Sequence, residues 1–446
     1  MEFVIKISQF LLSLSLLIVL HELGHFIPAK AFKTRVEKFY LFFDIKYSLL
    51  KKKIGDTVYG IGWLPLGGYV KISGMIDESM DKAQMALPPQ PWEFRSKPAW
   101  QRLIIMLGGV TVNFILAWII YIFTAAFYGD TTVSTNSIKD GYLIENNALQ
   151  DVGLKTGDNI VSINGVKYDN LADLSYSFIS AKEALIERDG QEININFPQD
   201  FAGKLTNSNG QPLLNLRTPF YVDHAVDTLH NGNSGIKKGD IIVGINDKEL
   251  KYFDQLEDVI GQFKNQEVVA HILRDGKPLD IALKVNEKGK LGIISGGSLE
   301  VFDKLGYLDL VRKDYSFMES FGVGSEKFVK QFKKYGEQLK LIFTPSTGAY
   351  QGVGGFYAIY NVFPDTWSWE FFWSITAFLS IMLAVLNLLP IPALDGGHVM
   401  FLLYEMVSGR KPSEKFLERA QMVGFFILIG LVLFANGNDI FKAIFN

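Results

Sequence analysis

Cysteine is absent from the 446 residues of this chain. Disulfide bonds are therefore excluded, and a metal ion would have to be held by histidine, aspartate or glutamate side chains. A charge excess is also missing, because 44 Lys and Arg residues are balanced by 47 Asp and Glu residues to a net charge of -3. This charge balance gives no sign of nucleic-acid binding, and we find no basic-aromatic patch that would suggest it.

Hydrophobic residues, in contrast, make up 48% of the chain. They gather in four runs long enough to cross a bilayer, at residues 7–29, 103–127, 371–394 and 420–438. A cleaved signal peptide is the alternative for the first run. That run has no small-x-small cleavage site before His21, and its apolar character resumes afterwards, which favours a retained anchor. We therefore predict a polytopic α-helical membrane protein with four transmembrane helices.

Basic residues are dense in two of the connections between these runs. Residues 30–102 contain the triple lysine Lys51–Lys53, and the connection after the third run also carries several lysines and arginines. Lys and Arg concentrate in cytoplasmic loops near membrane ends, so both connections are predicted to be cytoplasmic. The amino terminus and the long region 129–370 then lie outside the cytoplasm.

The outer region contains an internal repeat. The string GLKTGDNIVSINGVKY begins at Gly153, and GIKKGDIIVGINDKEL begins at Gly235. Each copy is followed by an Asp-Gly turn, at Asp189-Gly190 and Asp275-Gly276, which is typical of a β-hairpin. Two copies in the same order predict two inserted α+β domains of one fold.

The only histidine, acidic or basic side chains within the four runs are His21, Glu22 and His25. On a helix this His-Glu-x-x-His spacing puts both imidazoles on one face, as zinc ligands require, and Glu22 beside them could take a proton from water. The pattern is frequent by chance in soluble helices. Inside a membrane segment, however, ionisable residues are functional by default.

A catalytic zinc site needs a third protein ligand and an open position. Asp395 and His398 are the candidates, because they directly follow the third run. Runs one and three cross the membrane in the same direction, so the two motifs are expected to meet at the same cytoplasmic depth. The histidines of the outer region, His224, His230 and His271, would lie across the bilayer from them.

Two motifs carry a resemblance to a known family. His-Glu-Leu-Gly-His at residues 21–25 and Asn-Leu-Leu-Pro-Ile-Pro-Ala-Leu-Asp-Gly-Gly at residues 387–397 resemble the site-2 protease family of intramembrane zinc metalloproteases. Both motifs are complete. The repeated string also resembles circularly permuted bacterial PDZ domains, so the likeness extends to the family's bacterial members with tandem PDZ domains and covers nearly the whole chain.

The resemblance implies roles for single residues. His21, His25 and Asp395 would ligate Zn2+, with Glu22 as general base, while His398 would lie next to the ligands or at an interface. Asn387 would hold the substrate backbone, although a helix-packing hydrogen bond is the alternative. Pro390 and Pro392 would break the helix, so that backbone groups face a hydrated cavity.

Residues 57–73, TVYGIGWLPLGGYVKIS, resemble the family's membrane-associated β-hairpin, with a turn signal at residues 65–68. Gly67, Gly68 and Tyr69 are then expected to contact an unwound substrate that pairs with the free edge. An ordinary cytosolic hairpin is the alternative. In the second run, Gly108-Gly109 and Asn113 resemble a family Gly-x-x-x-Asn element, and their expected role is helix packing.

The predicted boundaries follow from these motifs. They are 1–29 for the first span, 30–102 for a cytoplasmic loop, 103–127 for the second span, 129–205 and 206–297 for the two PDZ-like domains, 298–370 for a linker with an amphipathic helix, 371–397 for the third span, 398–419 for a second cytoplasmic loop and 420–438 for the fourth span. The amphipathic stretch at 326–343 is expected either on the outer membrane surface or on the second PDZ-like copy.

The resemblance implies a monomeric protease of the bacterial inner membrane that cuts transmembrane helices. Its partners would be trimmed single-pass proteins, of the anti-sigma factor or remnant signal peptide type. The PDZ-like copies would either filter substrates by size or capture new chain ends. A membrane-anchored PDZ scaffold with a non-catalytic metal site is the alternative, and a metal transporter is disfavoured because the second and fourth runs are almost purely apolar.

Overall fold

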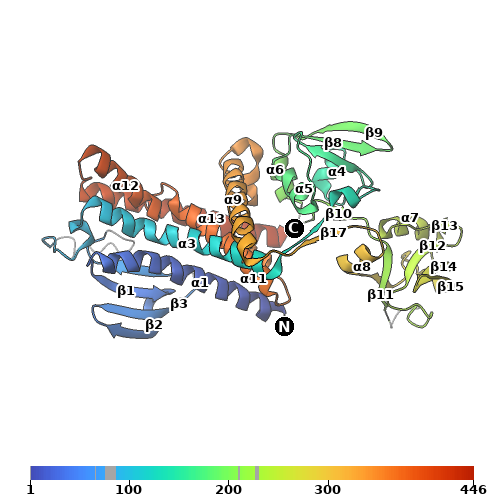
Figure 1. The fold of residues 1–446 in the computed structure, drawn as a ribbon, viewed down its shortest axis with the longest axis horizontal. Helices are drawn as coiled ribbons and strands as arrows, with labels where there is room; N and C mark the ends of the chain where they lie inside the picture. Colours follow the sequence, from blue (N-terminus) through green and yellow to red (C-terminus); the bar gives the residue numbers. More distant parts are fainter. Residues whose placement is uncertain (1, 66, 76–86, 209–210, 227–230, 446) are drawn as a thin grey trace. The chain divides into compact units, whose positions relative to one another are not determined.

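The computed structural model describes residues 2–65, 67–75, 87–208, 211–226 and 231–445 (Figure 1). The chain forms two compact units. Unit 1 consists of Met1–Gly129, Asp314–Lys340 and Val353–Asn446, and unit 2 consists of Asp130–Lys313 and Leu341–Gly352. Unit 1 contains the long helices and one sheet, while unit 2 contains the repeated motif.

Four helices of the described residues are long and apolar enough to cross a membrane, which confirms the predicted number. They are α1 (Glu2–Ala31), α3 (Ala99–Tyr128), α11 (Trp369–Leu388) and α13 (Glu414–Phe445). Local sequence explains the bounds of α3. It follows Pro98, which lacks a backbone N–H, and it ends at Gly129, whose φ of 66° is easily adopted only by glycine.

Helix α3 lies between α1 and α11 in unit 1, and small residues bring it close to α1. A Cβ atom added at Gly24 would lie only 2.4 Å from the carbonyl oxygen of Gly108, so the two backbones are in direct contact. On the other side, the Ser380 hydroxyl of α11 donates to the backbone carbonyl of Asn113 at 2.8 Å. The predicted packing role therefore fits Gly108.

The amphipathic stretch forms helix α9 (Phe317–Ile342). Tyr335 of α9 belongs to a core cluster with Ala117 of α3 and Ile381 of α11. The Trp118 indole of α3 donates to the Ser325 hydroxyl at 2.8 Å. The apolar face of α9 thus packs on two membrane-type helices, α3 and α11. The two alternatives from the sequence were the outer membrane surface and the second PDZ-like copy, and neither included these helices.

The prediction that the third span runs to residue 397 is wrong. Helix α11 ends at Leu388, and a new helix, α12 (Asp395–Ser408), begins at Asp395. Pro390 and Pro392 explain the break, because each lacks the N–H that the helix would need. The segment 398–419, predicted as a loop, is therefore largely helical, since α12 and the start of α13 occupy most of it.

The predicted hairpin at 57–73 is also wrong. The four-stranded sheet of unit 1 has the order β2 (Phe43–Ile54), β3 (Thr57–Leu64), β1 (Val36–Leu41), β4 (Tyr69–Ile72). Strand β1 lies between β3 and β4, parallel to the first and antiparallel to the second. The hairpin is formed instead by β2 and β3, through a turn with Gly55 at φ 60°.

Unit 2 contains two α+β halves. The first half has the strands β6 (Tyr142–Leu143), β7 (Asn159–Ile163), β8 (Glu183–Arg188), β9 (Gln191–Asn196) and β10 (Asn215–Leu216), with helices α4 (Asn147–Asp151), α5 (Leu171–Ser177) and α6 (Phe201–Thr206). Its core includes Leu149, Phe178 and Leu214. Because Leu214 belongs to this core, the first domain continues beyond the predicted boundary at 205.

The second half has the strand order β15 (Lys277–Lys284), β14 (Glu267–Arg274), β12 (Ile241–Ile245), β11 (Phe220–Ala225), β16 (Ile293–Ser295), with β13 (Lys248–Glu249) on β12 and helix α7 (Leu256–Ile260). After helix α8 (Leu299–Lys304), strand β17 (Leu310–Lys313) pairs with β5 (Asp130–Val133), so that Lys313 lies opposite Asp130. The two ends of this region are therefore adjacent.

The repeated motif makes the same contacts in both halves. Arg188 donates to Asp158 at 2.6 Å and to the Gly153 carbonyl at 2.7 Å. Its counterpart Arg274 donates to Asp240 and to the corresponding glycine carbonyl at 2.7 and 2.8 Å. Both Asp-Gly turns join hairpin strands with positive φ angles, as predicted. The repeat therefore encodes one local structure twice.

Candidate functional site

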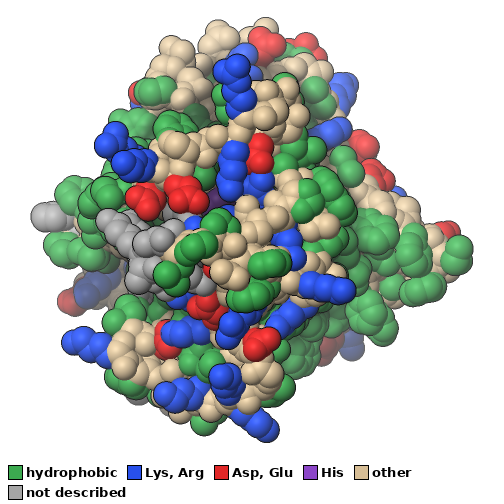
Figure 2. Space-filling model, turned by 90° about the vertical axis from the view of Figure 1, so that its left-hand side faces the viewer, with side chains coloured by type: hydrophobic (Ala, Val, Ile, Leu, Met, Phe, Trp, Pro, Cys, Tyr) green, Lys and Arg blue, Asp and Glu red, His purple; other side chains and the backbone are tan. Residues whose placement is uncertain are grey.

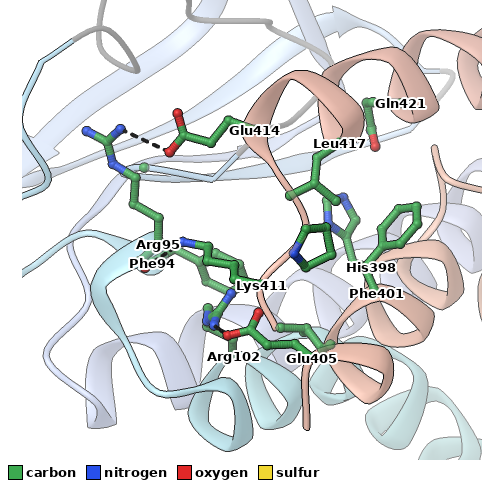
Figure 3. A pocket seen from close by; sticks show the side chains of 13 residues that line it. Phe94, Arg95, Arg102, His398, Phe401, Glu405, Lys411, Glu414, Leu417 and Gln421 are labelled. Atoms are coloured by element: carbon green, nitrogen blue, oxygen red, sulfur yellow. Dashed lines mark hydrogen bonds and ion pairs between the residues drawn. The ribbon is translucent and has the colours of Figure 1, made fainter. Parts of the chain in front are cut away.

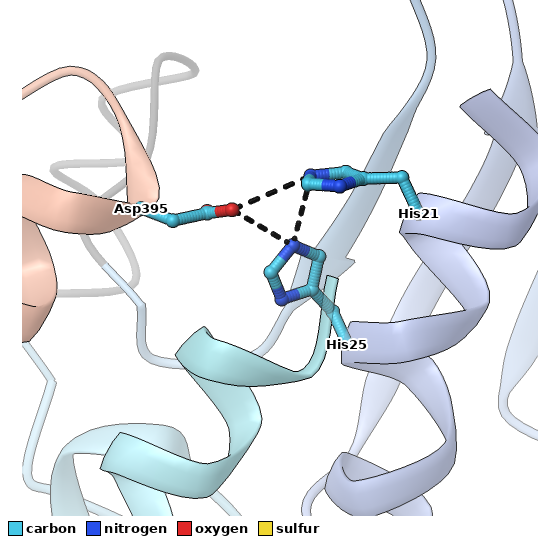
Figure 4. A group of neighbouring side chains, drawn as sticks. All are labelled: His21, His25 and Asp395. Carbon is cyan, nitrogen blue, oxygen red and sulfur yellow. Dashed lines mark hydrogen bonds and ion pairs between the residues drawn. The ribbon is translucent and has the colours of Figure 1, made fainter. Parts of the chain in front are cut away.

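Three side chains from two distant parts of the chain converge in unit 1 (Figure 4). His21 and His25 lie one turn apart on α1, with 3.3 Å between their Nε2 atoms. Asp395, the first residue of α12, places its Oδ2 atom 3.3 Å from each of these nitrogens. The structure thus brings together the three residues that the sequence motifs singled out, with both histidines buried.

Hydrogen bonds from α3 orient both imidazoles. His25 Nδ1 lies 2.8 Å from the carbonyl oxygen of Ile105, which accepts only if Nδ1 carries the proton. The Nε2 lone pair of His25 is then free to bind a metal ion. His21 Nδ1 lies 3.1 Å from Nδ2 of the Asn113 side-chain amide. Asn113 therefore contacts an imidazole in addition to packing the helices, which was the only role expected from the sequence.

Glycine at position 109 gives the two imidazoles their room. A Cβ atom on Gly109 would lie 2.4 Å from His25 Nε2 and 2.7 Å from His21 Cε1. Both distances are far below van der Waals contact. Helix α3 therefore presents a hydrogen-bonding carbonyl, an amide and a side-chain-free surface to the same pair of rings.

The three donor atoms fit a zinc ion. They all lie within 4.8 Å of one another, and two imidazole nitrogens with one carboxylate oxygen form a donor set that zinc accepts in catalytic sites. Asp395 Oδ2 is buried and has no hydrogen-bond partner among the described residues. A buried carboxylate oxygen without a hydrogen bond is costly, and a bound cation would satisfy it.

The three residues line a cavity of about 600 Å³, which is large enough to leave an open metal position. Glu22, Asn387, His398, Gly68 and Tyr69 line the same cavity. Pro390, Pro392 and Gly67 do not appear in its described lining. Pro392 packs near Gly424 of α13, and Gly67 packs near Phe43, so these three residues shape the surrounding chain.

The edge strand β4 approaches α1 next to Glu22. A Cβ atom on Gly68 would lie 2.5 Å from Ile18 Cγ2 and 3.7 Å from Glu22 Cγ, so glycine permits this approach. The backbone of Val70 hydrogen-bonds the Glu22 carboxylate. The residues of β4, which is paired with β1 on one side, therefore line the cavity next to Glu22.

A second, smaller cavity of about 50 Å³ shares His398 and Gln421 with the first (Figure 3). Its floor contains the ion pair between Arg102 of α3 and Glu405 of α12, at 2.5 Å. Burial and the nearby Arg102 lower the pKa of Lys411, which also lines this cavity. The ion pair ties α12 to α3, and so fixes the helix that begins with Asp395.

Comparisons with known proteins agree with this chemistry. The sequence profile of Peptidase family M50 matches residues 9–431. A protein of Campylobacter jejuni, provisionally named a zinc metalloprotease, is 28% identical over 441 residues, which cover 97% of this chain and 92% of the relative. The regulator of sigma E protease of Haemophilus influenzae is 25% identical over 469 residues, which cover 99% of this chain and 100% of the relative.

The chain therefore belongs to Peptidase family M50, the site-2 protease family. It is a zinc-dependent metalloprotease. Its four apolar helices, and the bacterial proteins to which it is similar, fit a multi-pass protein of the inner membrane.

Proposed function

We propose that this protease hydrolyses peptide bonds within transmembrane segments of single-pass membrane proteins. The observation that carries the proposal is the position of the His21–His25–Asp395 cluster. It lies between helices of membrane length, in a cavity that Glu22 also lines. A protease that acted only on soluble chains would not need these residues among apolar helices.

In this proposal His21, His25 and Asp395 would hold the zinc ion, which would supply Lewis acidity toward the scissile carbonyl and water. The Ile105 carbonyl accepts a hydrogen bond from a protonated His25 Nδ1, which leaves the Nε2 lone pair of that ring available. Asn113 Oδ1 is buried without a hydrogen-bond partner among the described residues. The Nδ2 atom of the same amide lies 3.1 Å from His21 Nδ1, and exchanging the amide oxygen and nitrogen would make Oδ1 the acceptor for a protonated Nδ1.

Glu22 takes a proton from the attacking water and returns it to the leaving amine. The edge of β4 that faces away from β1, together with the preceding Gly68, holds an unwound substrate in an extended conformation, because a helical substrate keeps its carbonyls in its own hydrogen bonds. Asn387 on the opposite wall binds the substrate backbone. Cleavage takes place on the cytoplasmic side, following the distribution of basic residues.

The two halves of unit 2 are PDZ-like domains outside the cytoplasm, and they exclude substrates whose outer domains have not been trimmed. Anti-sigma factors and remnant signal peptides are the substrate types that fit. Because Asp130 pairs with Lys313, residues 131–312 can be replaced by a short linker. If a variant with this deletion leaves untrimmed substrates uncut, the size-filter role fails, and capture of a new chain end takes its place.

The central test compares the wild type with Glu22→Gln on a tagged single-pass helix with a shortened outer domain. General base catalysis is worth about 10²–10⁴ in rate, so we expect a loss of that size with zinc content unchanged. Zinc is measured on both purified proteins. If the variant cuts as fast as the wild type, Glu22 is not the base. If neither protein cuts several such helices while both hold zinc, the scaffold alternative is favoured.

A further inference from the structure

Two helices complete the candidate metal centre around the histidines of α1, and a buried ion pair joins them. Helix α3 contacts the imidazoles through Ile105 and Asn113, and α12 begins with Asp395. Arg102 of α3 donates to Glu405 of α12 at 2.5 Å, and the two side chains meet in Figure 3. The pair therefore connects the helix that contacts both rings with the helix that supplies the carboxylate.

This pair is shielded from water, unlike the charges on the nearby surface. Figure 2 shows Lys, Arg, Asp and Glu side chains close together at the end of unit 1 near α12. Ion pairs at such a surface are weak, because they are solvated and screened. The Arg102 side chain is only 7% exposed and the Glu405 side chain 16%, so their attraction is screened much less.

On α3 the arginine lies on the same stripe as the groups that contact the imidazoles. Gly109 and Asn113 follow Arg102 by seven and eleven residues, which is close to two and three helical turns, and all three are buried. Arg102 Nε also donates to the carbonyl of Lys97, which precedes α3, at 2.9 Å. The planar guanidinium is therefore fixed at the start of the helix whose next turns contact the rings.

On α12 the glutamate lies at the end opposite to the metal ligand. Glu405 follows Asp395 by ten residues, or roughly 15 Å of helix. Between them, Val399 and Leu402 belong to one core cluster with Ile105 of α3. Apolar contacts bring the two helices together, but they are not directional. The charge-assisted hydrogen bond is directional, so it sets the rotation and the slide of α12 along α3.

We propose that Arg102 and Glu405 are positioning residues for the metal ligand Asp395. The pair holds α12 in the rotation that places the Asp395 carboxylate 3.3 Å from both Nε2 atoms. Helix α11 does not set this rotation, because residues 389–394 separate α11 from α12 and belong to neither helix. The inference rests on the metal ligands of the proposed function, and it concerns zinc binding rather than cleavage.

A contribution to stability alone is the competing role, and one double variant separates the two. Replacing a buried ion pair by apolar residues of similar volume is often neutral or stabilising, whereas removing one partner leaves an unpaired buried charge. R102M/E405L should therefore keep the unfolding temperature of the metal-free parent while it lacks the directional contact. We expect its zinc affinity to fall about 10–100-fold, the range for groups that orient metal ligands.

Zinc affinity is measured by competition with a chelator, on the full chain purified in a neutral detergent. R102K keeps the charge and one hydrogen bond to Glu405, so it should recover most of the affinity that R102M/E405L loses. The proteins saturated with Co2+ give a second readout, because the visible absorption of Co2+ depends on the geometry of its ligands. We expect altered bands in R102M/E405L, whereas a role in stability alone leaves them unchanged.

The matched control for Glu405→Gln is Glu93→Gln. Glu93 pairs with Arg95 at 2.6 Å and its side chain is only 4% exposed, but both residues precede α3 and belong to neither α3 nor α12. Both single variants should lower the unfolding temperature, and only Glu405→Gln should lower zinc affinity. Parental zinc affinity in R102M/E405L would overturn the proposal, as would equal losses of zinc affinity in the two single variants. Because no substrate is present, these results do not depend on whether the protease cuts transmembrane segments.

Discussion

Gly109→Ala is the smallest change that tests how the metal centre is built. The added Cβ atom would lie 2.4 Å from His25 Nε2, whereas ordinary van der Waals contacts begin near 3.4 Å. The ring would therefore have to move by about 1 Å. Helix α3 has little freedom to retreat instead, because Gly108 and Gly24 already place its backbone against that of α1.

The displacement is large for a metal site, in which ligand distances hold within about 0.2 Å. We therefore expect Gly109→Ala to lower zinc affinity by more than about 100-fold, beyond the 10–100-fold typical of changes in residues that only orient the ligands. Overpacking should also destabilise unit 1 by about 1–3 kcal/mol. Zinc per protein by elemental analysis, the unfolding temperature and cleavage of the tagged helix measure the three effects.

Gly430→Ala is the matched control, since it makes the same change in α13, where no heavy atom lies within 4 Å of the added Cβ. It should keep zinc, stability and activity. The reasoning is refuted if Gly109→Ala retains stoichiometric zinc and wild-type cleavage. Equal losses in both variants would point to a general effect of alanine in membrane helices.

Three further outcomes follow from the same contacts. Asn113→Ala should lower zinc affinity about 10–100-fold without removing a metal ligand, as metal titration would show; unchanged affinity would exclude the orienting role. Zinc removal by a chelator should lower the free energy of unfolding by about 4 kcal/mol, if free zinc was at 1,000 times its dissociation constant before removal. An unfolding temperature that does not change on chelation would contradict this expectation. Burial alone would raise the pKa of Asp240, but hydrogen bonds from Arg274 and from the Lys237 backbone lower it below its usual value. The carboxylate therefore stabilises unit 2 above the unfolded pKa of about 3.9, and this contribution is lost as the pH falls through the lowered folded value. Hydrogen exchange in unit 2 should show this acid sensitivity, and Asp240→Asn should flatten it.

Part of the centre was predictable from local spacing and membrane parity. His21 and His25 share a face by helical periodicity, and the common direction of the first and third spans left Asp395 and His398 as candidates for the third ligand. The resemblance to the site-2 protease family then favoured Asp395. The role of Asn113 was harder to predict. Its spacing from Gly109 was visible in the sequence. A hydrogen bond from Asn113 to an imidazole, however, depends on how α3 is rotated against α1. The contact between Gly24 and Gly108 sets this rotation only when the two helices pack together.

The sheet could not be predicted in the same way, because strand pairing is non-local. Two β-prone stretches around Pro65 and two glycines are typical of a hairpin, yet β1, from 20 residues earlier in the chain, pairs with both stretches. The burial pattern gives the reason. Val36 and Tyr40 of β1 are almost fully buried, so β1 belongs in the middle of the sheet and the stretch around residue 70 is displaced to an edge.

That displacement has a functional consequence. In the predicted hairpin, β4 would pair directly with β3, its neighbour in sequence. The outer edge of either strand could then lie towards α1. With β1 in between, β4 becomes the terminal strand of the described sheet, and Gly68 allows the chain at the start of β4 to approach Glu22. The break at Pro390 and Pro392 has the complementary effect on the other wall, because it ends α11 and lets Asp395 begin a new helix at the cavity. One wall of the cavity is thus formed by the edge strand β4, and the other carries Asp395, the carboxylate of the metal-ligand cluster. Both features come from interruptions of regular structure, which membranes tolerate only where protein or water covers them.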